Sequence, residues 1–140
     1  MLEVLSDAEE AYAFIATQVP VARAAFDKGI VQRLNGKTNA AVLYTSFNGV
    51  NVIATIAGTP GTPWLSKKFL YWIFHYPFAQ MGAKRITVAI DRDNQASICF
   101  ALRCGFTQEG TLHGAGAEGQ DVLLFVLWKQ DCRFGGLTGV

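Results

Sequence analysis

Charge is scarce in this chain of 140 residues, and the charge that is present nearly cancels. Charged side chains make up 16% of the sequence, and 12 basic against 11 acidic residues give a formal net charge of +1. No run of like charge forms the basic face that nucleic-acid binding requires, so no nucleic-acid partner is expected. The chain also lacks the roughly 20 continuous apolar residues of a membrane span, so no membrane partner is expected.

Metal ligands and cysteines are equally few. The chain has two histidines, and its three cysteines, Cys99, Cys104 and Cys132, show no metal-ligand spacing. A structural zinc site needs four convergent ligands, so no metal is predicted. Unpaired cysteines are typical of a reducing compartment, and the acidic N-terminal segment has no signal-peptide pattern. We therefore expect a cytoplasmic protein.

Apolar residues, by contrast, make up 51% of the sequence. A chain of this length and composition predicts a single domain over residues 1–140 with a substantial buried core. Gly-rich residues 135–140 are predicted to form a flexible tail.

The first half of the chain alternates short apolar segments with turn signals. Ser6 and Glu9 have the spacing of a capping box, and Pro20 suits the first turn of a second short helix. Asn-Gly pairs at 35–36 and 48–49 predict tight turns between strands. The elements expected are a strand over 1–5, helices over 6–18 and 20–26, and strands over 30–34, 40–47 and 50–57.

The second half begins with a turn-rich loop, Gly-Thr-Pro-Gly-Thr-Pro, over residues 58–63. An apolar and aromatic segment follows and predicts a long helix, in which Pro77 disturbs the regular hydrogen bonding. The elements expected are helices over 66–81 and 95–104 and strands over 85–90, 107–113 and 122–129.

The segment from Asn94 to Phe106 is the most informative part of the chain. Asn94 follows a strand and can cap the next helix, while Gly105 suits a left-handed residue at the helix end. Ile98, Ala101 and Leu102 form the apolar stripe of that helix. Phe106 then returns the chain to the core.

This strand, Asn, helix, Gly-Phe, strand pattern resembles the second half of the GNAT superfamily, the acetyl-CoA-dependent N-acyltransferases. In that family a small residue, here Ser97, follows the Asn by three positions, and the Gly of Gly-Phe follows it by eleven. The resemblance implies a mixed α/β fold with a central, mostly antiparallel twisted sheet. It also implies a splay between the fourth and fifth strands and helices on both faces.

The resemblance further implies acetyl-CoA as co-substrate and an amine acceptor, either a small molecule or a protein amine, and it allows a homodimer. The cofactor would lie along the fourth strand, the following turn and the start of the next helix. The family's Gln/Arg-x-x-Gly-x-Gly/Ala signature is absent from this turn, and Pro60 and Pro63 remove two N–H donors. The cofactor-binding residues implied are Ile56, Ala57, Gly58, Gly61, Trp64, Leu65, Ser66, Lys67, Asn94, Ser97 and Phe100.

Several of these residues have simpler interpretations that the sequence leaves open. Asn94 can serve only as a helix cap, and Ser97 as an exposed first-turn residue. Lys67 opposes the helix dipole in a first turn, where it either pairs with a phosphate or extends into water.

Catalytic candidates are Asp91, Ser97, Glu109 and His113. Asp91 ends a strand and can act as a base or simply shape a turn. Glu109 and His113 are alternative bases, or else a solvated strand residue and a surface histidine. Many family members carry a Tyr acid seven residues after the Asn; here that position is Ala101, so Ser97 or water would have to protonate the thiolate.

The segment from Trp64 to Cys132 also resembles short GNAT-like proteins of tailed phages. It contains Trp-Leu-Ser-Lys at 64–67, Tyr-Pro-Phe-Ala-Gln-Met-Gly at 76–82 and Asp-Cys-Arg-Phe at 131–134. The leading hypothesis is an N-acetyltransferase that acts by direct attack in a ternary complex. The alternative is a catalytically degenerate GNAT-fold protein with a binding or structural role, derived from a phage.

Overall fold

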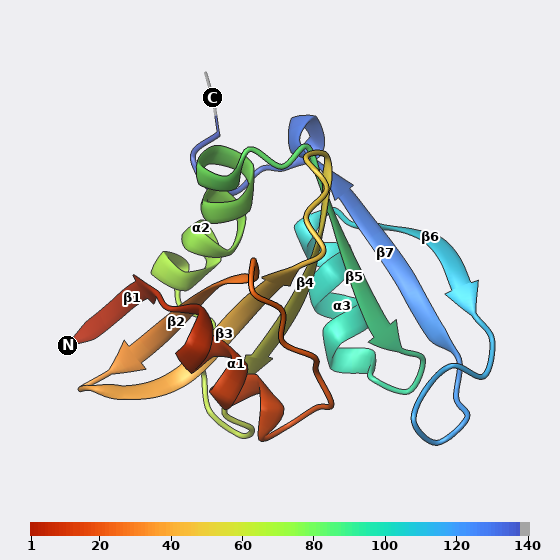
Figure 1. Ribbon diagram of the computed structural model, residues 1–140, viewed down its shortest axis with the longest axis horizontal. Coiled ribbons are helices and arrows are strands. Elements are labelled where there is room, and N and C mark those ends of the chain that lie inside the picture. The colour runs from red at the N-terminus through yellow and green to blue at the C-terminus, as the bar shows by residue number, and fades with distance from the viewer. Residues whose placement is uncertain (138–140) are drawn as a thin grey trace.

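The computed structural model describes residues 1–137, and within them seven strands form one sheet in the order β1-β2-β3-β4-β5-β7-β6 (Figure 1). Neighbouring strands are antiparallel except β4 and β5, which are parallel. This confirms the predicted mostly antiparallel sheet. The strands are β1 (Leu2–Ser6), β2 (Lys28–Leu34), β3 (Lys37–Thr45), β4 (Asn51–Gly58), β5 (Arg85–Asp91), β6 (Thr107–Leu112) and β7 (Val122–Trp128).

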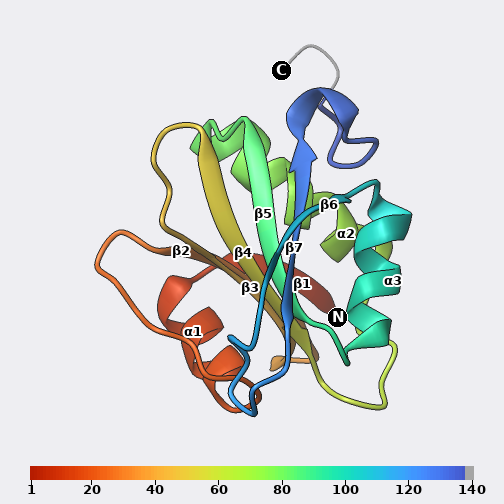
Figure 2. The same ribbon diagram turned by 90° about the vertical axis from the view of Figure 1, so that its right-hand side faces the viewer.

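Helices cover both faces of the sheet, as predicted. Figure 2 shows α1 (Ala8–Ala16) on one side, and α2 (Lys67–His75) and α3 (Gln95–Cys104) on the other. A π-helix, η1 (Tyr76–Met81), continues α2, and a short 3₁₀ turn, η2 (Lys129–Asp131), follows β7. None of the helices within residues 1–137 is long and apolar enough to cross a membrane.

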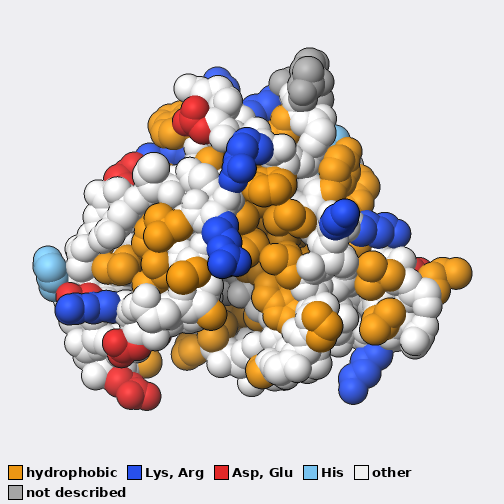
Figure 3. Space-filling model, turned by 180° about the vertical axis from the view of Figure 1, so that it is seen from behind, with side chains coloured by type: hydrophobic (Ala, Val, Ile, Leu, Met, Phe, Trp, Pro, Cys, Tyr) orange, Lys and Arg blue, Asp and Glu red, His pale blue; other side chains and the backbone are white. Residues whose placement is uncertain are grey.

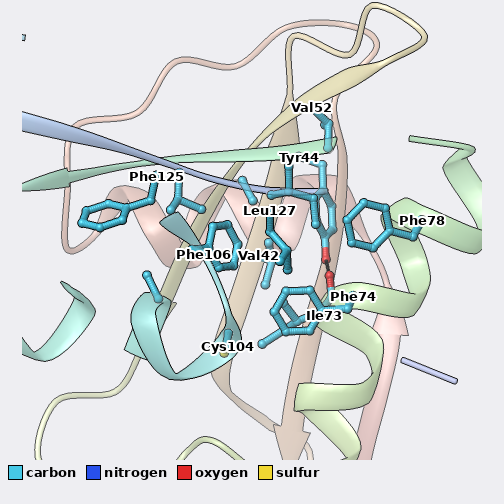
Figure 4. Close-up of a cluster of buried hydrophobic side chains, with 14 of the residues drawn as sticks. Val42, Tyr44, Val52, Ile73, Phe74, Phe78, Cys104, Phe106, Phe125 and Leu127 are labelled. Atoms are coloured by element: carbon cyan, nitrogen blue, oxygen red, sulfur yellow. Dashed lines mark hydrogen bonds between the residues drawn. The ribbon is translucent and has the colours of Figure 1, made fainter. Parts of the chain in front are cut away.

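The main core lies between the sheet and the α2/α3 layer. Phe69, Phe74 and Phe78 of α2 and η1 are fully buried there, as is Tyr44 of β3. Figure 4 shows Tyr44, Phe74 and Phe78 in this cluster. The Tyr44 hydroxyl donates a 2.7 Å hydrogen bond to the Ile73 carbonyl and thereby ties β3 to α2. A smaller apolar cluster joins α1 to the opposite face of β2–β4.

Pro77 changes the hydrogen bonding of the predicted 66–81 helix without ending it. The α-helical part stops at His75, and the wider turns of the π-helix continue to Met81. Proline removes one N–H donor from the regular ladder, and the π pattern accommodates that loss. The change at Pro77 is therefore confirmed.

The predicted second helix, over residues 20–26, is wrong, because this segment is irregular. The Ala24 N–H donates to the Asp27 carboxylate at 2.7 Å, and Arg23 pairs with Glu9 at 2.6 Å. These side-chain bonds compete with helical ones in a segment too short to be stable as an isolated helix.

Two details of the other helices also differ from expectation. Asp7, not Ser6, caps α1: its carboxylate accepts the Glu10 N–H at 3.0 Å, while Ser6 ends β1. In α3 the buried positions are Ala101 and Cys104, and Leu102 is 54% exposed. Leu102 lies about a quarter turn from Ala101 around the helix, outside the narrow stripe that contacts the core.

The chain after η2 returns to the α2 layer. Gly135 is buried, with its carbonyl oxygen 2.6 Å from His75 Nδ1, and Leu137 packs against the main core. The flexible tail was predicted over 135–140; its last three positions, 138–140, lie outside the described residues.

Candidate active site

The parallel strands β4 and β5 stay together for only part of their length. Asn51–Ile53 pair with Arg85–Thr87, and beyond these residues the two strands separate. β4 continues beside β3 as far as Gly58, and β5 beside β7 as far as Asp91. The predicted splay between the fourth and fifth strands is therefore confirmed.

A cavity of about 660 Å³ lies at this divergence and receives residues from both faces of the sheet. In β4 and β5, residues that share a face with the buried Val52–Ile86 pair point toward α2 and α3, and alternate residues point toward α1. Ile56 and Ile90 line the cavity on the α3 face, and Thr55 and Asp91 line it on the α1 face. The lining of the cavity therefore includes residues from both faces of the sheet.

The wall on the α3 face is built on the first two turns of that helix. The Asn94 side chain accepts the Ser97 N–H at 3.2 Å, which confirms Asn94 as a helix cap. Asn94, Ser97 and Phe100 all line the cavity, with the buried Ala101 beneath them. Gly105 ends the helix at φ 99°, and Phe106 enters the core, as the sequence predicts.

Trp64 closes the same wall from the β4 side. Its indole lies over Gly58, where an added Cβ would come within 2.1 Å of the ring, so only glycine fits. The buried Gln32 donates to the Trp64 carbonyl at 2.6 Å, and its own carbonyl oxygen accepts from the Ser66 hydroxyl. Ser66 in turn caps α2 by accepting the Phe69 N–H at 2.9 Å. These contacts hold the 58–66 turn in place.

The turn leaves few backbone donors free. The N–H groups of Thr59, Thr62, Trp64 and Ser66 are bonded within the protein. Within residues 1–137, the N–H groups of Gly61 and Leu65 donate to no backbone or side-chain acceptor, and Lys67 begins α2 with no acidic residue in its first turn. Free N–H groups near a helix N-terminus suit an anion.

Figure 3 shows the α2/α3 face as a hollow with hydrophobic side chains at its centre and Lys and Arg side chains around it. Such a surface suits a ligand with an apolar arm and phosphate groups. Among residues 1–137, no three His, Cys, Asp or Glu side chains gather as a metal site would require.

The wall on the α1 face comes from separate parts of the chain. Val19 and Pro20 follow α1, Ala89 and Val122 lie on β5 and β7, and residues 115–117 belong to the β6–β7 loop. Asp91, at the end of β5, is the one ionisable side chain among the cavity-lining residues. Gln120 donates to one of its carboxylate oxygens at 2.9 Å.

The β6–β7 loop is closed by its own hydrogen bonds. The Gly114 N–H donates to the Asp121 carboxylate at 2.9 Å, and the Gly116 N–H donates to the Gln120 carbonyl at 2.8 Å. His113 and Arg92 lie 3.6 and 3.7 Å from the same carboxylate. The Gly114 hydrogen bond, helped by the charges of His113 and Arg92, holds the pKa of Asp121 below its usual range.

The structure brings together two of the four catalytic candidates. Asp91 and Ser97 line the cavity, on opposite faces. Glu109 instead forms a two-pronged ion pair with Arg85, at 2.8 and 2.9 Å, and His113 pairs with Asp121; neither lines the cavity.

Of the cofactor candidates, five line the cavity: Ile56, Trp64, Asn94, Ser97 and Phe100. The others lie along the adjoining strand and turn: Ala57, Gly58, Gly61, Leu65, Ser66 and Lys67.

Solved structures similar to this chain include spermidine N-acetyltransferases. The spermidine N-acetyltransferase SpeG of Vibrio cholerae in complex with CoA and spermine matches with a TM-score of 0.74, 14% identity, and coverage of 93% of this chain and 96% of that chain. A dodecameric form of the same enzyme gives a TM-score of 0.77, 13% identity, and coverage of 92% and 94%. No protein-family model and no curated protein sequence matches.

The fold is the GNAT fold. Identity this low establishes the architecture alone, so the activity has to be argued from the site.

Within a GNAT fold, the position of Ala101 is informative. It is buried at the base of the α3 wall and lines the cavity, at the position where the resemblance found in the sequence implies a Tyr acid. The residues that line the cavity include no Tyr, Cys, His or Lys. The hydroxyl groups among them are those of Thr55 and Ser97.

Proposed function

We propose that this protein is an N-acetyltransferase that passes the acetyl group of acetyl-CoA directly to a primary amine in a ternary complex. The observation that carries the proposal is the cavity at the β4–β5 divergence. Its lining residues come from both faces of the sheet, so we infer that the two substrates approach from opposite faces and meet between the strands. The structural similarity to an enzyme solved with CoA and spermine supports the same pairing of substrates.

Acetyl-CoA enters from the α2/α3 face in this proposal. Its pantetheine arm lies against Asn94, Ser97 and Phe100, which line that wall. β4 has no strand partner on its β5 side beyond Ile53, so N–H groups on that edge of residues 54–58 are free to bond the arm and the thioester carbonyl.

The pyrophosphate lies at the 58–66 turn. The free N–H groups of Gly61 and Leu65 and the positive end of α2 attract it, and Lys67 adds a charge there. Ser66 contributes indirectly, because it caps α2 and is bonded to Gln32.

The amine enters from the α1 face, and Asp91 is the base. Its carboxylate takes one proton from the ammonium and passes it to solvent, and the neutral nitrogen attacks the acetyl carbonyl carbon. The C–N bond forms and the C–S bond then breaks, releasing CoA as the thiolate. The second proton lost by nitrogen ends on that sulfur, through water or the Ser97 hydroxyl.

The presence of Ala101, where the resemblance implies a Tyr acid, is compatible with this chemistry. A thiol with a pKa of about 8.5 is a good leaving group near neutral pH, so departure of the thiolate needs little help from an acid. We infer that Ser97 assists and that the reaction does not depend on a dedicated tyrosine.

The second candidate function is a GNAT-fold protein without catalysis that serves as a binding or structural component of a phage particle. Ala101 favours it, together with the two prolines at positions 60 and 63 in the cofactor turn. It predicts a stable macromolecular partner and no turnover of any amine. A homodimer stays a prediction under either function.

Calorimetric titration with acetyl-CoA tests the proposed function. We expect micromolar binding, near −8 kcal/mol. Lys67→Glu should weaken binding at low salt and less at high salt, because screening removes the charge contribution. The matched control is Lys37→Glu, at the exposed first residue of β3. Absence of binding at millimolar acetyl-CoA would reject the enzyme and favour the binding protein.

A further inference from the structure

The wall of the cavity on the α1 face has a chemistry that selects among amines. This inference rests on the proposed function, since it names the class of amine that the same site accepts. The side chains of this wall are small and mostly apolar: Val19, Pro20, Ala89, Ala115, Ala117 and Val122. Thr55 adds a hydroxyl group, and Asp91 adds the single charge.

Asp91 is placed to receive one ammonium group. Gln120 occupies one carboxylate oxygen at 2.9 Å, and the other accepts no hydrogen bond from residues 1–137. An ammonium seated there is paired with a charge and stands at the point where β4 and β5 have separated.

A second positive charge on the same small amine has no partner in the cavity. Asp121 is already engaged by Gly114, His113 and Arg92, and Glu118 is exposed outside the lining. The apolar side chains of this wall offer a second ammonium no hydrogen-bond acceptor, so contact with them costs it part of its hydration without a partner, whereas an apolar body gains from the same contact.

We propose that the acceptor is a primary monoamine with a compact apolar body, and that amines with a second ammonium within a few carbons of the first are rejected. This separates the protein from the spermidine acetyltransferases that share its fold, whose solved ligand, spermine, is a polyamine.

Two amines of equal length provide the test. Pentylamine and 1,5-diaminopentane share the reacting amine and the carbon chain, and they differ by the second ammonium. We expect kcat/KM with acetyl-CoA to favour pentylamine by about tenfold or more, from the cost of the unpaired charge. Equal rates, or preference for the diamine, would overturn the proposal.

Substitutions at Ala117 test whether the wall on the α1 face causes the preference for pentylamine over 1,5-diaminopentane. Ala117 is exposed on the β6–β7 loop and lines the cavity, so it tolerates a larger side chain. Ala117→Glu should reduce the preference for pentylamine by about threefold or more, because it supplies the missing partner, while the isosteric Ala117→Gln should keep it. A ratio unchanged in Ala117→Glu would place the discrimination elsewhere and overturn the proposal.

Acetyl-CoA titration of the same samples shows whether a negative result contradicts only the acceptor class or the proposed function as a whole. Acetyl-CoA binding without turnover of either amine would overturn the acceptor class and leave the cofactor site standing. Absence of acetyl-CoA binding would overturn the proposed function itself.

Discussion

The two walls of the cavity are built in different ways. The wall on the α3 face comes largely from one continuous segment, 94–106, whose helix is capped at both ends and rests on the main core. The wall on the α1 face is assembled from the segment after α1, the end of β5, the start of β7, and the β6–β7 loop, which is closed by hydrogen bonds to Asp121 and Gln120.

This difference suits two ligands with different demands. In the proposed function, acetyl-CoA is held by a rigid helix and a strand edge, whose geometry follows from the fold. The proposed acceptor is contacted by loops, which can change in sequence without disturbing the core. Substitutions on the α3 wall should therefore alter cofactor binding, and substitutions on the α1 wall should alter acceptor use.

The largest effect is expected for Asp91→Asn. The amide keeps an oxygen for the Gln120 hydrogen bond but cannot take a proton, so kcat should fall about 10²–10⁴-fold. Acetyl-CoA affinity, measured by calorimetry, should stay within about twofold, because the proposed cofactor site lies on the other wall.

Glu109→Gln is the matched control for this prediction. It removes the ion pair with Arg85. Because the Glu109 side chain is half exposed, that pair contributes at most about 1 kcal/mol to stability, and its loss should leave kcat nearly unchanged. A greater loss of kcat in Glu109→Gln than in Asp91→Asn would contradict the assignment of the base.

The second effect concerns the contact between Gly58 and Trp64. Gly58→Ala forces the indole away from the strand, because the new Cβ would overlap the ring, and overpacking of this kind costs about 1–3 kcal/mol of stability. Acetyl-CoA affinity should fall as well, because Trp64 lines the α3 side of the cavity.

Gly110→Ala is the control, since its added Cβ would meet only Leu124 at 3.9 Å. Thermal unfolding with and without acetyl-CoA measures both variants. Equal melting temperatures for the two variants would show that the indole moves without cost.

The contrast between the walls also explains what the sequence could predict. The α3 wall was predictable because Asn94, Gly105 and Phe106 carry their signals locally, as a cap, a left-handed helix end and a return to the core. Most of the fold was predictable for the same reason, since strands and turns are short-range patterns.

The α1 wall was not predictable beyond Asp91. Val19, Pro20 and residues 115–117 carry no chemical signal, and they meet only because the segment after α1 and the β6–β7 loop both reach the splay. The ion pair of Glu109 was not predictable for a similar reason. Its partner Arg85 is 24 positions away, so the ion pair that occupies it depends on the pairing of β5, β7 and β6.

The third prediction compares two helix caps. Asn94→Ala and Asp7→Ala each remove a side-chain acceptor from a first-turn N–H, of Ser97 and Glu10, so each should lose about 1 kcal/mol of stability. Because Asn94 lines the cavity and Asp7 does not, acetyl-CoA binding should weaken only in Asn94→Ala. Equal affinities in the two variants would reduce Asn94 to a structural cap.

The smallest effect is confined to the α1 wall and appears only in acid. The pKa of Asp121 is lowered, first by the Gly114 N–H and then by His113 and Arg92. A lowered pKa means that the folded state favours the carboxylate. The resulting stabilisation is complete above the unfolded value of about 3.9 and is lost as the pH falls through the lower folded value.

The β6–β7 loop should therefore loosen below about pH 4, before the α3 wall responds. The Gly114 amide resonance, followed by NMR from pH 6 downward, should shift with a midpoint below the ordinary aspartate value. In Asp121→Asn that shift should disappear, while the Ser97 amide resonance should behave alike in both proteins. A midpoint at or above the ordinary value would mean that Asp121 does not hold the loop, and the acceptor wall would then owe its shape to Gln120 and its bonds to Asp91 and Gly116.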